Sequence, residues 1–332
     1  MTRICFLSHY NSRYTVETDY ELSRLLDEAS KRGLVGEVLR LPSTGFGEMS
    51  AMTSVSVSSV DSKGATIIQE ITIPRYLQLN ESLDTLPDIV LLKNSFSASW
   101  REQYSALFDN YKSANVTIVN EIEQQTRMTN KADVYRILQA AGIPIPKTLI
   151  LPYPLSDSDK ERVEDEIGYP CAIKLPHGYE GSQVELCRAS VDLTDVVDQL
   201  VERRIEPVEE LIFQEHIHDS FHTYSAHIVG DFINADIRIG DPTNPEPFKA
   251  SSMPGNMRFQ FAVDSQLEAI TKASLAAIGL DFARFDLVKK NGQYLILEAN
   301  VSGTFTRTEN CNRANIAGAL IDRAVAVHQN LS

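Results

Sequence analysis

Three oxygen-bearing side chains near the end of the chain have the types and spacing of a metal site. Asp286 lies in one apolar segment, and Glu298 and Asn300 end the next, with a Lys-Lys-Asn-Gly turn between them. The two segments read as a β-hairpin, in which residues two apart share one face. Buried paired carboxylates need a neutralising cation, and an oxygen-only set with room for phosphate suits Mg²⁺, with Mn²⁺ as a substitute. The alternative is a solvent-facing hairpin with polar tips.

A second group of residues has the character of a phosphate-binding loop. Lys174 ends an apolar run, where a charge needs a partner, and Gly178 and Gly181 flank Tyr179-Glu180 shortly after it. Such glycines let backbone N–H groups approach phosphate oxygens, although a glycine pair is also common in plain turns. The sequence has neither a Walker G-x-x-x-x-G-K-[ST] motif nor a G-x-G-x-x-G motif after its first strand. This disfavours P-loop and Rossmann nucleotide binding.

In the first part of the chain, predicted strands and helices alternate. Apolar runs at 4–7, 88–93 and 116–120 predict buried strands, and helical spacing before Gly33 and across 104–111 predicts helices. Residues 42–66, rich in Ser, Thr and Gly, are interpreted as weak strands or an excursion. The alternation predicts an α/β layer with a mostly parallel sheet from residue 1 to about 120.

The rest of the chain predicts a different arrangement. A helix capped by Asn130 or Thr129 ends at Gly142, and a capping box Ser265-x-x-Glu268 opens another that closes at Gly279. The predicted strands are 171–174, 211–214, 285–288 and 294–297, with a hairpin across 223–239 and an irregular proline-rich loop across 240–258.

Four blocks in this order resemble the ATP-grasp ligases. The blocks cover about residues 121–328. Any one of them alone would be weak evidence for the resemblance, whereas four in the same order are strong evidence. The first is Lys131-Ala132-Asp133 with the segment 142–148, and the second is 169–174 followed by 178–182. The third is Phe213-Gln214-Glu215-His216-Ile217, and the fourth is Asp286, Glu298 and Asn300 with Ser302-Gly303 behind them.

The resemblance implies an α/β protein with ATP held between two α+β lobes of an ATP-grasp fold. Residues 1–120 would form the N-terminal pre-ATP-grasp domain. Residues 121–210 would form the central lobe with the glycine-rich loop, and residues 211–332 the C-terminal lobe with the magnesium site.

The resemblance also implies which residues bind the nucleotide. Lys131 and Lys174 would contact the α- and β-phosphates from opposite sides, under a loop that contains Gly178, Gly181 and Ser182. Adenine would lie against Gln214, Glu215, His216 and Ile217. Related ligases carry an acidic-x-arginine step after this hinge, where this chain has Phe221-His222-Thr223-Tyr224-Ser225; His222 or Asp219 is therefore expected at the ribose.

Two arginines are expected at the reacting groups. Arg238 matches a position where related ligases keep a basic residue near the transferred phosphate; the structural alternative is a salt bridge to Asp236 or Asp241. Arg258, in the proline-rich loop, could bind the substrate carboxylate in bidentate fashion.

The segments 278–281, 297–300 and 315–318 resemble most the RimK-like α-L-glutamate ligases and related amino-acid ligases. The implied reaction joins a small-molecule or peptide carboxylate to an amino acid or other amine, through an acyl-phosphate, with ATP and Mg²⁺. One alternative is a dipeptide ligase of the D-Ala–D-Ala type. Another, of a different class, is a non-catalytic ATP-binding sensor or subunit, which would have no need of paired metal carboxylates.

Composition limits the partners. The 332 residues include 31 Lys and Arg against 45 Asp and Glu, for a net charge of −14, which argues against nucleic-acid binding. Four widely spaced cysteines, no membrane-length apolar run and no signal-like start indicate a reduced, cytoplasmic protein. The histidines His216, His218, His222 and His227 match no usual zinc spacing. Similar ligases are commonly dimers, so a homodimer is compatible with the sequence.

Overall fold

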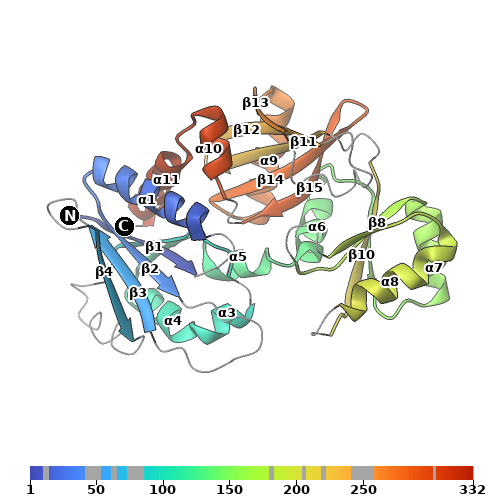
Figure 1. Cartoon of the computed structure of the whole chain (residues 1–332), viewed down its shortest axis with the longest axis horizontal. Coiled ribbons are helices and arrows are strands. Elements are labelled where there is room, and N and C mark those ends of the chain that lie inside the picture. The colour runs from blue at the N-terminus through green and yellow to red at the C-terminus, as the bar shows by residue number, and fades with distance from the viewer. Residues whose placement is uncertain are drawn as a thin grey trace.

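The computed structural model describes residues 1–9, 15–41, 54–60, 66–72, 86–96, 98–178, 183–203, 207–217, 222–240, 257–301 and 304–331. These residues form three sheets, of six, four and five strands, together with the helices that cover them (Figure 1).

The N-terminal sheet is mostly parallel, as predicted, with the order β4-β3-β2-β1-β5-β6. Its parallel strands are β1 (Arg3–His9), β2 (Val35–Leu41), β5 (Ile89–Leu92) and β6 (Thr117–Val119), and β3 (Ser54–Val60) and β4 (Thr66–Thr72) extend it in antiparallel fashion. The helices of this part are α1 (Thr15–Lys31), α3 (Ala98–Gln103) and α4 (Ser105–Ser113).

Successive residues of β1 face two different cores, because side chains alternate along a strand. Ile4 and Phe6 pack with the residues of α1 and of the C-terminal helix α11 (Ile316–Leu331). Cys5 and Leu7 pack with the residues of α4 on the other side. Figure 1 shows α11 beside α1, so the end of the chain completes the core of its first domain.

Two short helices lead into the central lobe. They are α5 (Ile122–Arg127) and α6 (Lys131–Ala140), and the Asn130 side chain caps α6 by accepting from the N–H groups of Ala132 and Asp133. The central sheet is antiparallel, with the order β7-β10-β8-β9. Its elements are β7 (Thr148–Pro152), α7 (Asp157–Arg162) with a π-helical turn (Val163–Ile167), β8 (Cys171–Lys174), β9 (Val184–Cys187), a 3₁₀ turn (Ser190–Asp192), α8 (Leu193–Glu202) and β10 (Glu210–Glu215).

The C-terminal sheet is also antiparallel, with the order β13-β12-β11-β14-β15. Its strands are β11 (His222–Val229), β12 (Phe232–Ile239), β13 (Met257–Phe261), β14 (Phe282–Lys290) and β15 (Gln293–Asn300), and its helices before α11 are α9 (Ser265–Ile278) and α10 (Thr306–Asn312). One face packs apolar residues such as Ala226, Phe285 and Leu287 against α9. The opposite face is polar.

The structure differs from the sequence-based expectations at three places: the start of α9, the segment around Arg258, and strand β10. Asp264, not Ser265, caps α9, because its carboxylate accepts from the N–H of Leu267 at 2.8 Å. Arg258 lies on strand β13 rather than in an irregular loop, because residues 257–261 pair with β12. Strand β10 belongs to the central sheet, and the predicted domain boundary at 210/211 falls inside this strand.

Within the described ranges, none of the helices combines the length and the apolar character that crossing a bilayer requires.

Candidate active site

The polar face of the C-terminal sheet collects the three predicted metal ligands and the two predicted arginines. Because side chains alternate, Asp286 shares this face with its cross-strand neighbours Ser225 and Glu298, and Arg284 shares it with Asn300. The members of the polar face are Thr223, Ser225, His227, Asn234, Asp236, Arg238, Arg258, Arg284, Asp286, Glu298 and Asn300. Such a concentration of buried charge is stable only if the groups pair with one another or with a ligand.

Asp286 is the centre of this face. Ser225 Oγ donates to its Oδ1 at 2.9 Å, Arg238 Nη2 donates to the same oxygen, and Arg284 Nη2 lies 3.4 Å from Oδ2. Burial favours the neutral acid, but the two guanidinium charges and the Ser225 hydroxyl outweigh it and hold the pKa of Asp286 well below its usual range. Asp286 is therefore a carboxylate at neutral pH.

Glu298 and Asn300 complete the predicted oxygen set. Glu298 lies opposite Asp286, and the Asn300 amide nitrogen lies 3.5 Å from Asp286 Oδ2. Among the described residues, no three His, Cys, Asp or Glu side chains come together as a ready-made metal cage. Two carboxylates and one amide still fit Mg²⁺, which binds through one or two carboxylates and completes its shell with phosphate oxygens and water.

Lys131 reaches this oxygen set from the central lobe. As the first residue of α6, it places its Nζ 3.6 Å from Glu298 Oε1 and donates to the carbonyl oxygen of Gly178. Burial and the nearby charge of Lys174 lower the pKa of Lys131, and Glu298 opposes the shift. The ammonium groups of Lys131 and Lys174 are neighbours, and the half-buried Glu298 carboxylate offsets only one of the two charges. The remaining positive charge is one that a phosphate can neutralise.

Lys174 is held in place by side chains of the central lobe. Its Nζ donates to Gln214 Oε1 at 2.7 Å and to Tyr135 Oη at 3.0 Å. Gln214 is buried and donates to Thr148 Oγ1 at 2.9 Å. The structure thus places Lys174 beside Gln214, whose side chain orients the lysine.

The other residues predicted to bind the nucleotide near β10 and β11 lie at the end of β10, directly after it, or at the start of β11. The Glu215 carboxylate accepts from the N–H of Lys147 at 2.9 Å and pairs with Lys290, so its side chain joins β10 to the β14–β15 hairpin. Ile217 packs against Val288 and Leu295. His216 is half-buried after β10, and His222 is exposed at the start of β11. Gly181, Ser182, Asp219, Asp241, Ser302 and Gly303 lie outside the described residues.

Three arginines lie on the polar face. The structural alternative for Arg238 was a salt bridge to Asp236 or Asp241. Arg238 pairs with Asp286, and Asp241 lies outside the described residues. Arg258 is the one that pairs with Asp236, at 2.8 Å. Arg284 was overlooked as a site residue, although its position two residues before Asp286 places it on the same face.

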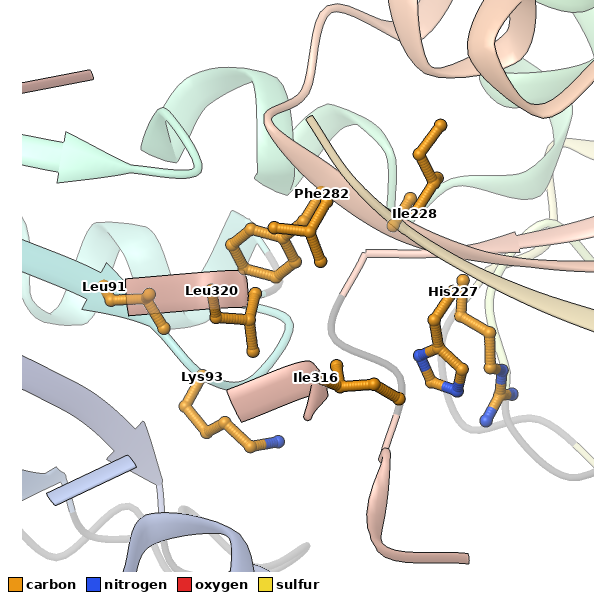
Figure 2. Close-up of a pocket in the computed structure, with 10 residues that line it drawn as sticks. Leu91, Lys93, His227, Ile228, Phe282, Ile316 and Leu320 are labelled. Atoms are coloured by element: carbon orange, nitrogen blue, oxygen red, sulfur yellow. The ribbon is translucent and has the colours of Figure 1, made fainter. Parts of the chain in front are cut away.

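His227 belongs to a buried hydrogen-bonded cluster. Its Nε2 lies 3.2 Å from Thr308 Oγ1 of α10, and burial, with the nearby charge of Arg284, holds its pKa well below the usual range. Figure 2 shows His227 and Lys93 beside a small cavity between the first domain and the C-terminal lobe. Its volume of about 20 Å³ admits one water molecule and no substrate.

Comparison with known proteins agrees with this geometry. The RimK-like ATP-grasp domain matches residues 128–324, more than half of the chain. A probable alpha-L-glutamate ligase of Legionella pneumophila (strain Corby) is 24% identical over 219 residues, 66% of this chain and 70% of that protein. Human N-acetylaspartylglutamate synthase A is 22% identical over 262 residues, 76% of this chain and 64% of that protein.

Solved structures show the same fold at low identity. The D-alanine–D-alanine ligase from Bacillus anthracis has a TM-score of 0.65 at 12% identity, over 100% of this chain and 98% of that chain. The ATP-grasp ligase PsnB, complexed with a minimal precursor, has a TM-score of 0.63 at 18% identity, over 98% and 100%.

Fold and site together define an ATP-grasp enzyme. More specifically, the chain belongs to the RimK-like ATP-grasp family and is an ATP-dependent carboxylate–amine ligase.

Proposed function

We propose that this ligase joins an amino acid, through its amine, to a small-molecule or peptide carboxylate, with an acyl-phosphate as the intermediate. The observation that carries the proposal is the meeting of Lys131 with Glu298 beside Asp286 and Asn300. This contact places a lysine of the central lobe, suited to binding phosphate, next to side-chain oxygens of the C-terminal lobe that are suited to binding a metal ion. The names of the relatives, a glutamate ligase and an N-acetylaspartylglutamate synthase, favour an amino acid as the amine.

In this mechanism Lys131 and Lys174 bind the phosphates of ATP, with the hinge residues 214–217 beside adenine and His222 at the ribose. The backbone around Gly178, with Gly181 and Ser182 in the following loop, covers the phosphates. Magnesium, bound by Asp286, Glu298 and Asn300 together with phosphate oxygens, would supply positive charge against the charge that develops on the transferred group.

Arg238 and Arg284 neutralise the transferred phosphoryl group from the polar face, and Arg258 binds a carboxylate of the substrate. The substrate carboxylate oxygen bonds to the γ-phosphorus as the bond to ADP breaks. The uncharged amine then bonds to the acyl carbon, phosphate leaves, and the amine nitrogen loses a proton. Positioning and charge neutralisation suffice for both steps, so no protein nucleophile is required.

The test is phosphate release from ATP and Mg²⁺ in the presence of a pooled panel of amino acids, dipeptides and small carboxylates, with Mn²⁺ as a second metal. Wild type is compared with Glu298→Ala and with Glu268→Ala, a matched control at an exposed position of α9. Release that needs one carboxylate and one amine, persists in Glu268→Ala and is lost in Glu298→Ala would support the proposal. Mass spectrometry of the product identifies the new amide.

Calorimetric titration with ATP and Mg²⁺ separates the remaining outcomes. Tight nucleotide binding without turnover on any pair would favour a sensor or subunit. Absence of nucleotide binding would overturn the assignment of these residues. A product made from two D-amino acids would favour the dipeptide-ligase alternative.

A further inference from the structure

Helix α10 covers part of the polar face, and its Thr308 hydroxyl lies at the centre of a buried cluster. Thr308 is fully buried, as is Asp236. Thr308 Oγ1 lies 2.7 Å from Asp236 Oδ2, 3.2 Å from Arg258 Nη1 and 3.2 Å from His227 Nε2. A single hydroxyl thus contacts three polar side chains from three different strands.

Donors and acceptors in this cluster can be assigned without ambiguity. A hydroxyl has one proton and two lone pairs, and the Asp236 carboxylate can only accept. Thr308 therefore donates to Asp236 and accepts from Arg258, which leaves one lone pair for a proton on His227 Nε2. Neutral His227, with its proton on Nε2, satisfies this requirement.

This cluster uses only one corner of the Arg258 guanidinium. Both of its contacts to described side chains, with Asp236 at 2.8 Å and with Thr308 at 3.2 Å, involve Nη1. The Arg258 side chain is 20% exposed, and Arg258 pairs in register with Arg238, the partner of Asp286. The Nε and Nη2 edge remains, and that edge has the fork geometry for a carboxylate.

The N-terminal domain fixes the position of α10. The Glu21 carboxylate, on α1, accepts from the N–H groups of Phe305 and Thr306 at 2.6 and 2.9 Å, and from Thr306 Oγ1 at 2.9 Å. Lys93, at the end of β5, pairs with the other Glu21 oxygen at 2.6 Å, and both side chains are buried. Thr308 thus follows a helix start that is anchored from the first domain.

We propose that Thr308 is a positioning residue for substrate recognition: with Asp236 and His227, it holds Nη1 of Arg258 so that the Nε–Nη2 edge is presented to the substrate carboxylate. This inference rests on the proposed function of Arg258. It adds that α10, anchored by Glu21, sets the orientation of that arginine.

The test compares Thr308→Val, which removes the hydroxyl at nearly constant shape, with Thr308→Ser, which keeps it. Thr271→Val is the matched control, because Thr271 is fully buried and its hydroxyl donates to Leu267 O inside α9. The first readout is the rate at which phenylglyoxal modifies Arg258, followed by peptide mass spectrometry. We expect Thr308→Val to raise this rate about tenfold, with Thr308→Ser and Thr271→Val within about twofold of wild type.

The second readout is kinetic, with the substrate pair found in the panel. We expect Thr308→Val to raise the KM for the substrate bound by Arg258 about tenfold and to leave the KM for ATP unchanged, with rescue in Thr308→Ser. An unchanged modification rate in Thr308→Val, or a KM change that Thr308→Ser shares, would overturn the inference. If wild type turns over no pair, the proposed function fails, while the modification rates still decide whether Thr308 holds Arg258.

Discussion

The ammonium group of Lys131 lies 3.6 Å from the Glu298 carboxylate, one at the start of α6 and the other on β15. This contact joins the two lobes where a nucleotide of this family is expected. Because Glu298 also lies in register with Asp286, the same carboxylate takes part in the lysine pair and in the proposed magnesium set.

Replacing Glu298 by Gln should lower phosphate release by about 10² to 10³-fold, because an amide keeps the shape and removes the charge that would face the cation. The change is measured by steady-state phosphate release at saturating ATP. Glu268→Gln should behave as wild type, since that residue lies on the surface of α9. Full activity in Glu298→Gln would remove Glu298 from the metal set.

Replacing Lys174 by Met should weaken ATP binding about tenfold or more, because the proposed charged donor to phosphate is lost while an unbranched side chain is kept. Titration calorimetry with ATP and Mg²⁺ measures the effect. Lys160→Met, on exposed helix α7, is the control for loss of one positive charge. Equal affinities in the two variants would show that Lys174 serves only to pack against Gln214 and Tyr135.

Replacing Glu28 by Gln should destabilise the fold at neutral pH by about 1–2 kcal/mol, allowing for screening of its partly exposed partners. Burial disfavours its charge, but hydrogen bonds from Asn315, Lys31, Arg32 and Arg24 prevail and lower its pKa from 4.5 to about 2. The folded state therefore holds this proton more weakly than the unfolded state. The stabilisation is complete above about pH 4.5 and is lost as the pH falls towards 2.

Urea unfolding of wild type and Glu28→Gln across this range measures the difference. It should shrink steadily as the pH falls, and a difference independent of pH would argue that packing rather than charge explains it. Asp157→Asn, on a fully exposed side chain of α7, serves as the control and should have little effect at any pH.

The ring of His227 should remain neutral, with its proton on Nε2, as the pH falls through about 6.5, where an ordinary histidine gains a proton. Burial lowers its pKa most, Arg284 adds to the shift, and Asp286 opposes it. Because the unfolded chain binds this proton below about pH 6.5 and the folded protein does not, this histidine should also reduce stability as the pH falls through that value. Long-range ¹H–¹⁵N NMR of the histidine rings measures the tautomer; titration near pH 6.5 would contradict the cluster around Thr308.

Local pattern was enough for much of this protein. Strand alternation alone predicts that Glu298 and Asn300 share a face. Asp286 joins that face through a register shift between Asp286 and Leu287, which the sequence pattern does not indicate. The Asn130 cap and the Gly279 end of α9 were likewise predicted, since a cap depends on neighbouring residues. The cap at Asp264 was missed because Ser265-x-x-Glu268 offers the same signal one residue later.

Contacts between distant segments were decided only by the tertiary structure. No periodicity relates Glu21 to Phe305, or Thr308 to Asp236 and Arg258, because these pairs meet through the packing of α1, α10 and the polar face. Arg258 was assigned to a loop because the nearby prolines and glycines mask a short edge strand that forms by pairing with β12. The choice of Asp286 over Asp236 as the partner of Arg238 likewise depends on side-chain direction in the folded sheet. Sequence alone determined which chemical groups are present and, apart from Arg258, which strands carry those of the polar face; the packing of separate elements decided which of those groups touch.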